Sequence, residues 1–128
     1  MVKDTLVESW IQAGLLLTQS LDEAGFPVVA SFWFYDTETN EWQLKIASPA
    51  VDKEGPLEAY RRIQIILRQK PQLKSLSLND ISVLSPKDEL VRNLRMALRT
   101  GRTLTGIRFT RNRVGDEYIE DAYVYRVA

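Results

Sequence analysis

Apolar side chains near the start of the chain recur every three or four residues, which is the spacing of an amphipathic helix. The apolar face of this helix is formed by Leu6, Trp10, Ala13 and Leu17. Thr5 and Glu8 have the spacing of a capping box, so we expect the helix to begin near Thr5. The segment LDEAGFP, residues 21–27, breaks the pattern with glycine and proline and indicates a turn.

The pattern then changes to one that is typical of strands. Residues 28–35, VVASFWFY, are rich in β-branched and aromatic side chains. A turn-like segment, DTETNE, separates them from residues 42–48, where apolar and polar side chains alternate. We therefore predict a hairpin whose second strand has one solvent-exposed face. The four consecutive aromatic residues must alternate between faces, which favours a central strand that is buried on both sides.

The second half of the chain contains two further helical patterns. Pro56 follows Gly55 at a suitable first helical position, and Pro71 ends a predicted helix over residues 56–70. Residues 85–88, SPKD, combine a helix cap, a proline and an acidic residue. This third helix is predicted to extend to about Arg99 or Thr100, with Gly101 just after its end.

Three more strands complete the prediction. One lies near residues 76–84, and residues 103–111 and 117–127 form a second hairpin. The predicted order is α-β-β-α-β-α-β-β, and residues 1–128 form a single α+β domain. We expect a mixed, mostly antiparallel sheet with the helices packed mainly on one face. The strand–helix–strand unit of residues 76–111 is expected to supply the parallel pair of strands.

The amino-acid composition excludes several kinds of catalytic and binding site. The chain has no cysteine and no histidine, which excludes disulfides, thiolate chemistry and histidine-based catalysis. No cofactor and no metal site are predicted, since any metal would have to be a hard ion held by carboxylates. The sequence contains neither a secretory signal nor a membrane span, and we expect a cytoplasmic protein.

The charge of the chain is unevenly distributed, although its formal total is zero. Residues 1–60 carry three basic and ten acidic side chains, residues 61–113 carry thirteen and three, and residues 114–128 carry one and four. The central block is therefore strongly basic between two acidic ones. Segregated charge of this kind can steer oppositely charged partners.

The third predicted helix presents much of this basic charge. Its apolar side is formed by Leu90, Val91, Leu94, Ala97 and Leu98. At about 100° per residue, Arg92, Arg95 and Arg99 lie on the opposite side. Arg102 follows the predicted end of the helix and joins this group from the loop.

The second predicted helix carries a related stripe. Ile65 projects away from the apolar side of this helix, between Arg61 and Arg68. We expect this apolar residue and its two flanking arginines to form part of a contact surface, with Ile65 at its centre. Whether this stripe adjoins Arg92, Arg95, Arg99 and Arg102 depends on the fold.

We therefore expect a non-enzymatic binding or accessory protein that uses its basic, arginine-rich central region. Arginine forms planar, charge-assisted contacts with carboxylates and phosphates. The expected partner is an acidic protein or a second copy of the chain, and nucleic acid is an alternative partner for the same face. A solvated helix face without a partner is the plain structural alternative.

One enzymatic alternative is carried by Asp36, Gln43 and Lys45. An acidic residue at one strand end, followed on the next strand by an amide, one residue and a lysine, resembles the site pattern of PD-(D/E)XK nucleases. In that family the acidic and amide residues hold a divalent metal and the lysine assists the attacking water, and Glu8 would be a further ligand. An aspartate at a hairpin turn is also explained by turn chemistry alone.

Overall fold

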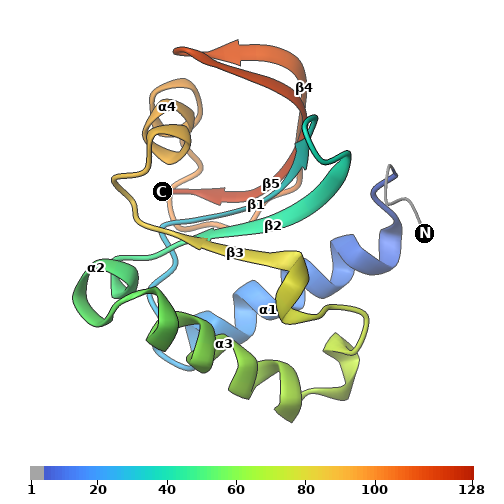
Figure 1. The fold of residues 1–128 in the computed structure, drawn as a ribbon, viewed down its shortest axis with the longest axis vertical. Coiled ribbons are helices and arrows are strands. Elements are labelled where there is room, and N and C mark those ends of the chain that lie inside the picture. Colours follow the sequence, from blue (N-terminus) through green and yellow to red (C-terminus); the bar gives the residue numbers. More distant parts are fainter. Residues whose placement is uncertain (1–4) are drawn as a thin grey trace.

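Strand β1, Ala30–Asp36, lies at the centre of the fold. The computed structural model, which describes residues 5–128, contains one five-stranded sheet in the order β3-β2-β1-β5-β4 (Figure 1). The other strands are β2 Glu41–Ala47, β3 Ile81–Leu84, β4 Ile107–Val114 and β5 Glu117–Val127. The helices are α1 Glu8–Glu23, α2 Ala50–Glu54, α3 Pro56–Gln69 and α4 Glu89–Ala97, with the single 3-10 turns η1 Pro71–Leu73 and η2 Leu78–Asp80. The predicted α+β class and element order are confirmed, with α2 as an additional short helix.

Both faces of β1 are buried, as we predicted from its four consecutive aromatic residues. Phe32 and Trp33 point to opposite faces of the sheet and are 0% and 1% exposed. This burial requires a covering layer on each side of the sheet. Helices α1 and α3 cover one face, and α4 covers the other (Figure 1).

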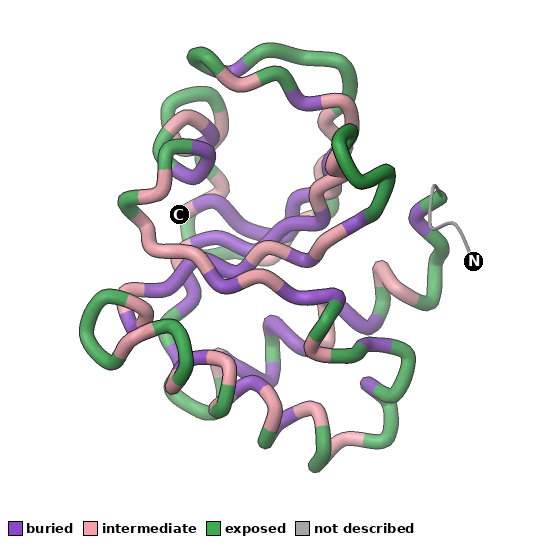
Figure 2. Tube along the Cα trace, in the orientation of Figure 1, coloured by how far each residue is buried: buried purple, intermediate pink, exposed green. Residues whose placement is uncertain are grey.

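Two apolar clusters result from this arrangement. The larger one joins α1 and α3 to Trp33, Trp42 and Tyr125 of the sheet. The smaller one joins Leu90, Val91 and Leu94 of α4 to the opposite face of β1 and β5. Figure 2 shows the buried residues concentrated along the sheet, with exposed residues on the outer sides of the helices and at the hairpin tips. The expectation that helices pack mainly on one face agrees with this distribution, and α4 is the exception.

The predicted location of the parallel pair was wrong. Strands β2 and β3 are parallel and are connected through α2 and α3, whereas β3 and β4 lie at opposite edges of the sheet. The reason is the face that α4 covers. Because α4 packs across the far side of the sheet, the chain after it reaches the edge beside β5 and pairs there antiparallel.

Two predicted helix boundaries also differ from the structure. Helix α1 begins at Glu8 without a side-chain cap, and Thr5 lies outside it. Helix α4 begins at Glu89, where the Asp88 carboxylate accepts a hydrogen bond from the Leu90 amide at 3.0 Å.

Helix α4 ends earlier than predicted. Leu98 is extended, and the Thr100 amide donates to the carbonyl oxygen of Val127 at 2.8 Å. Pairing with the end of β5 therefore takes the chain out of the helix before Gly101. As a consequence Arg99 lies beyond the helix.

Among residues 5–128, no helix is long and apolar enough to cross a membrane.

A buried ion pair connects the last strand to α1. The Arg126 side chain, 4% exposed, donates two hydrogen bonds to the Asp22 carboxylate, at 2.9 and 2.8 Å. Its other hydrogen bonds reach the carbonyl oxygens of Val28 and Arg102. One guanidinium thus joins α1, the segment before β1, β5 and the segment that follows α4.

We predict that Asp22→Ala strongly destabilises the protein. The substitution leaves the buried Arg126 guanidinium without its counter-charge, and the free energy of unfolding should fall by about 2–3 kcal/mol. Urea unfolding followed by circular dichroism measures the change. Glu23→Ala, at the exposed neighbouring position, is the control and should change it by less than about 0.5 kcal/mol. Equal effects of the two substitutions would contradict this role of Asp22.

Candidate functional site

Helix α4 carries two of the predicted arginines, Arg92 and Arg95, outside its buried face. Leu90, Val91 and Leu94 are buried against the sheet, which fixes the rotation of the helix about its axis. Arg92 is consequently exposed, and Arg95 is half-buried at the edge of the helix. The amphipathic pattern of the sequence therefore predicted correctly that these two side chains lie outside the buried face of the helix.

A shallow hollow on the outer side of α4 brings together three of the predicted arginines. The hollow measures about 280 Å³ and is lined by Arg92, Arg95, Met96 and Arg99. Met96 is 84% exposed, so it places an apolar side chain among three guanidinium groups. We call these four residues the arginine surface.

Backbone acceptors orient two of the guanidinium groups. Arg95 donates from Nε to the backbone oxygen of Ala128 at 2.9 Å. Arg99 donates from Nε to the carbonyl oxygen of Arg95, also at 2.9 Å, and so folds back onto the last turn of α4. These bonds use one donor of each five-donor guanidinium, and the terminal NH₂ groups keep their capacity for a bidentate contact.

Among residues 5–128, no acidic side chain forms an ion pair with a residue of the arginine surface. Within residues 5–128, the ion pairs of arginine involve Arg61, Arg62, Arg108, Arg111 and Arg126. None of them includes a residue of the arginine surface. The acidic residues of α1 and α3 lie on the other side of the sheet from the arginine surface.

The two predicted arginine groups do not adjoin. Arg61, Ile65 and Arg68 are exposed on α3, which lies on the opposite side of the sheet from α4. Arg61 is also engaged, because it pairs with Glu58 of its own helix at 2.6 Å. Arg102 is exposed in the segment after α4, where its carbonyl oxygen accepts a hydrogen bond from Arg126. The basic central region is therefore divided into separate surfaces.

A second, polar cleft of about 380 Å³ lies at the N-terminal end of α4. We call it the acidic cleft; its charged lining residues are Asp36, Glu38, Asp88, Glu117 and Lys45. They come from the β1–β2 hairpin, β2, the start of α4 and the start of β5. Carboxylates outnumber the ammonium group four to one, so the cleft is negative.

The acidic cleft contains two of the three residues of the nuclease alternative. Asp36 and Lys45 line it together, but Gln43 does not. The Gln43 side chain donates to the carbonyl oxygen of Asn79 at 3.0 Å and accepts from the Ser82 hydroxyl at 2.8 Å, so both ends of its amide bind the β3 side. In the described part of the chain, no group of three or more acidic side chains is placed to hold a metal ion.

Burial lowers the pKa of Lys45 below that of an ordinary lysine. The carboxylates of Asp36 and Asp88 act in the opposite direction and partly restore it. The ammonium group lies 5.8 Å from the ring centroid of Phe34, which stabilises its charged form by a cation–π contact. Lys45 is the one cationic side chain among the residues that line the acidic cleft.

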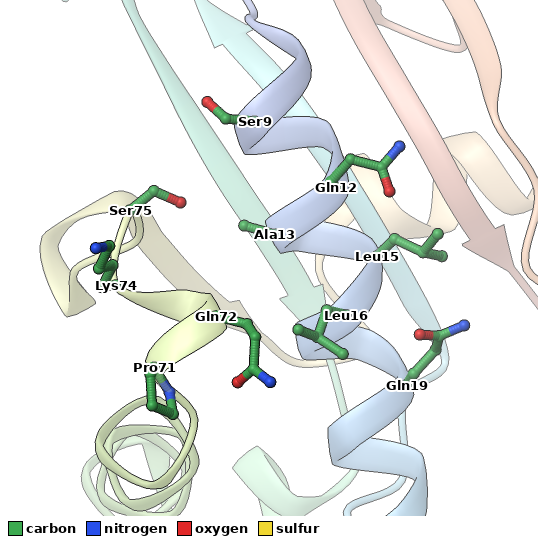
Figure 3. Close-up of a pocket in the computed structure, with 10 residues that line it drawn as sticks. All are labelled: Ser9, Gln12, Ala13, Leu15, Leu16, Gln19, Pro71, Gln72, Lys74 and Ser75. Carbon is green, nitrogen blue, oxygen red and sulfur yellow. The ribbon is translucent and has the colours of Figure 1, made fainter.

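A groove larger than the acidic cleft lies elsewhere and contains none of the predicted site residues. It measures about 540 Å³ and separates one side of α1 from residues 71–75 (Figure 3). Leu16 of α1 and Gln72 face it from opposite sides. Its lining combines aliphatic side chains with hydroxyls and amides, and Lys74 is the charged residue among them.

Sequence reasoning missed the acidic cleft, the groove and Met96. The exposed position of Met96 follows from the same helical rotation that places Arg92 outside, and could have been found from it. The cleft and the groove combine segments that are distant in the chain, for which the sequence contains no local signal.

Comparisons with protein-family models, with curated proteins and with solved structures found no match to this chain.

We predict that Lys45 makes stability depend on pH in the alkaline range. Its pKa is lowered in the folded protein, so the folded state releases its proton before the unfolded state, whose lysine pKa is about 10.4. The unfolded state then binds more protons, and the contribution of Lys45 to the free energy of unfolding rises with pH in this window. Urea unfolding at a series of pH values up to about 10 should show this rise, and Lys45→Met should remove it.

Lys87→Met, at an exposed position in the turn before α4, is the matched control and should keep the slope of the wild type. An unchanged slope in Lys45→Met would show that burial of Lys45 does not control this dependence.

Proposed function

We propose that the protein is a non-enzymatic binding protein whose arginine surface binds a carboxylate-rich surface of a protein partner. The observation that supports the proposal most directly is the hollow on α4, in which three arginines that form no ion pair among the described residues line the surface together with one exposed methionine. Charged groups that remain uncompensated within their own chain are suited to compensation by a partner.

The anchoring of the arginines favours a specific contact. Arg95 and Arg99 are each held by a backbone oxygen, so less side-chain freedom is lost when a carboxylate binds. Their planar terminal groups fit the two oxygens of a carboxylate. Met96 adds an unbranched apolar side chain that adapts to the shape of a partner.

Phosphates of a nucleic acid are a second candidate for the same arginines. Two features favour a carboxylate-bearing protein instead. A nucleic acid carries charge along its whole length, and a strand that continued along α4 would meet the acidic cleft at the other end of the helix. In addition, the formal net charge of the chain is zero, whereas nucleic-acid-binding domains are usually basic.

We predict that a fluorescently labelled polyglutamate peptide binds the protein and that Arg95→Glu plus Arg99→Glu weakens its binding at least about tenfold, because attraction becomes repulsion at two positions. Fluorescence anisotropy at low salt measures the affinity. Added salt should weaken the complex of the wild type, since the contacts are exposed to solvent.

Arg68→Glu on α3 is the control for Arg95→Glu and Arg99→Glu measured singly, so that each compared variant reverses one charge. It makes one charge reversal at an exposed arginine on the opposite side of the sheet and should leave the affinity unchanged within about twofold. A labelled DNA duplex of similar charge is tested in parallel. Tighter binding of the duplex through the same two arginines, or equal effects of the single variants and the control, would overturn the proposal.

A further inference from the structure

We infer that the partner of the arginine surface is a second copy of this chain, bound by antiparallel packing of the two α4 helices across a two-fold axis. The inference rests on the proposed function and identifies its partner. It is carried by the charge pattern along α4, where a negative end and a positive end lie on one exposed helix.

The exposed side chains along the outer side of α4 form a row that changes from negative at its first turn to positive at its last. Glu89 is exposed in the first turn, and among the described residues it forms no ion pair. Arg92 follows one turn later, and Met96 one further turn along the same side. Arg99 then folds back over the last turn. From its first to its last residue the helix spans about 12 Å, so the two ends of the row are well separated.

An antiparallel copy of this row complements the first. A two-fold axis level with the middle of α4 places Glu89 of each chain opposite Arg99 of the other. It also places Arg92 of each chain beside Met96 of the other. Such an interface is isologous, so each contact occurs twice and the assembly closes as a dimer.

The acidic cleft extends the complementarity beyond the helix. It lies at the same end of α4 as Glu89, and it includes Asp88, the residue immediately before Glu89. The negative field of the cleft therefore attracts the Arg95 and Arg99 side chains of the second copy. Within one chain Arg92 lies one turn from Glu89, whereas Arg95 and Arg99 lie toward the other end of the helix, away from the cleft.

The formal net charge of the chain does not oppose self-association by electrostatic repulsion. Its formal net charge is zero, so two copies do not repel each other at long range. Helix α4 has nine residues, and an interface centred on so short a helix is small. We therefore expect a reversible, concentration-dependent dimer that weakens with salt.

Sedimentation equilibrium of the full chain tests the inference. The wild type should show a monomer–dimer equilibrium, and Glu89→Arg and Arg99→Glu should each raise the dissociation constant about tenfold by creating like-charge contacts. The double variant Glu89→Arg plus Arg99→Glu exchanges the two charges and should restore the dimer to within about threefold of the wild type. Urea unfolding of each variant confirms that the chain remains folded.

Glu23→Arg on α1 and Arg68→Glu on α3 reverse matched exposed charges on the other side of the sheet and should leave the dimer unchanged. A wild type that sediments as a monomer at every soluble concentration would overturn the inference. A dimer that the two single variants leave intact, or that the double variant fails to restore, would overturn it as well.

The polyglutamate measurement separates this result from the proposed function. If polyglutamate binds through Arg95 and Arg99 while the wild type is monomeric, the proposed function stands and the second copy is the wrong partner. If both hold, polyglutamate should dissociate the dimer, because the two ligands compete for the same arginines.

Discussion

The burial of β1 on both faces is the constraint on which the rest of the fold depends. Phe32 and Trp33 are adjacent in sequence, point to opposite sides of the sheet and are both buried, so each face needs its own helical layer. Helices α1 and α3 supply one layer and α4 the other. The sheet therefore separates Arg61 and Arg68 of α3 from the arginine surface of α4. A basic block that is continuous in sequence is divided in space by one doubly buried strand.

The type and order of the elements follow from local patterns, and for that reason they could be predicted. The topology could not, because an amphipathic helix shows that it has an apolar side but not which face of a sheet this side covers. The Leu90, Val91 and Leu94 side of α4 fits either face in sequence terms. Its packing on the far face moves the next strand to the other edge, and the parallel pair consequently forms between β2 and β3.

The part of the candidate site that lies on helix α4 could be predicted from the sequence. Arg92 and Arg95 follow from the helical period, whereas Arg99 joins them for another reason. Leu98 is extended, and Arg99 returns to the helix through a hydrogen bond to the carbonyl oxygen of Arg95. The acidic cleft combines Asp36, Lys45 and Glu117 with the start of α4, and only the folded sheet brings these distant segments together.

Acidic and basic side chains are arranged differently on the two sides of the sheet. On the side of α1 and α3, acidic residues have arginine partners nearby, as in the pairs of Asp22 with Arg126 and Glu58 with Arg61. On the side of α4, the described residues leave negative charge at one end of the helix and positive charge at the other. The sheet separates the acidic residues of α1 and α3 from the arginine surface, and Asp36 and Glu38, which reach the α4 side, lie in the acidic cleft at the other end of the helix. The charges on α4 are therefore separated in space, with Glu89 at one end and the arginine surface toward the other, and in the inferred dimer a second, oppositely oriented copy of the same helix brings the two ends together.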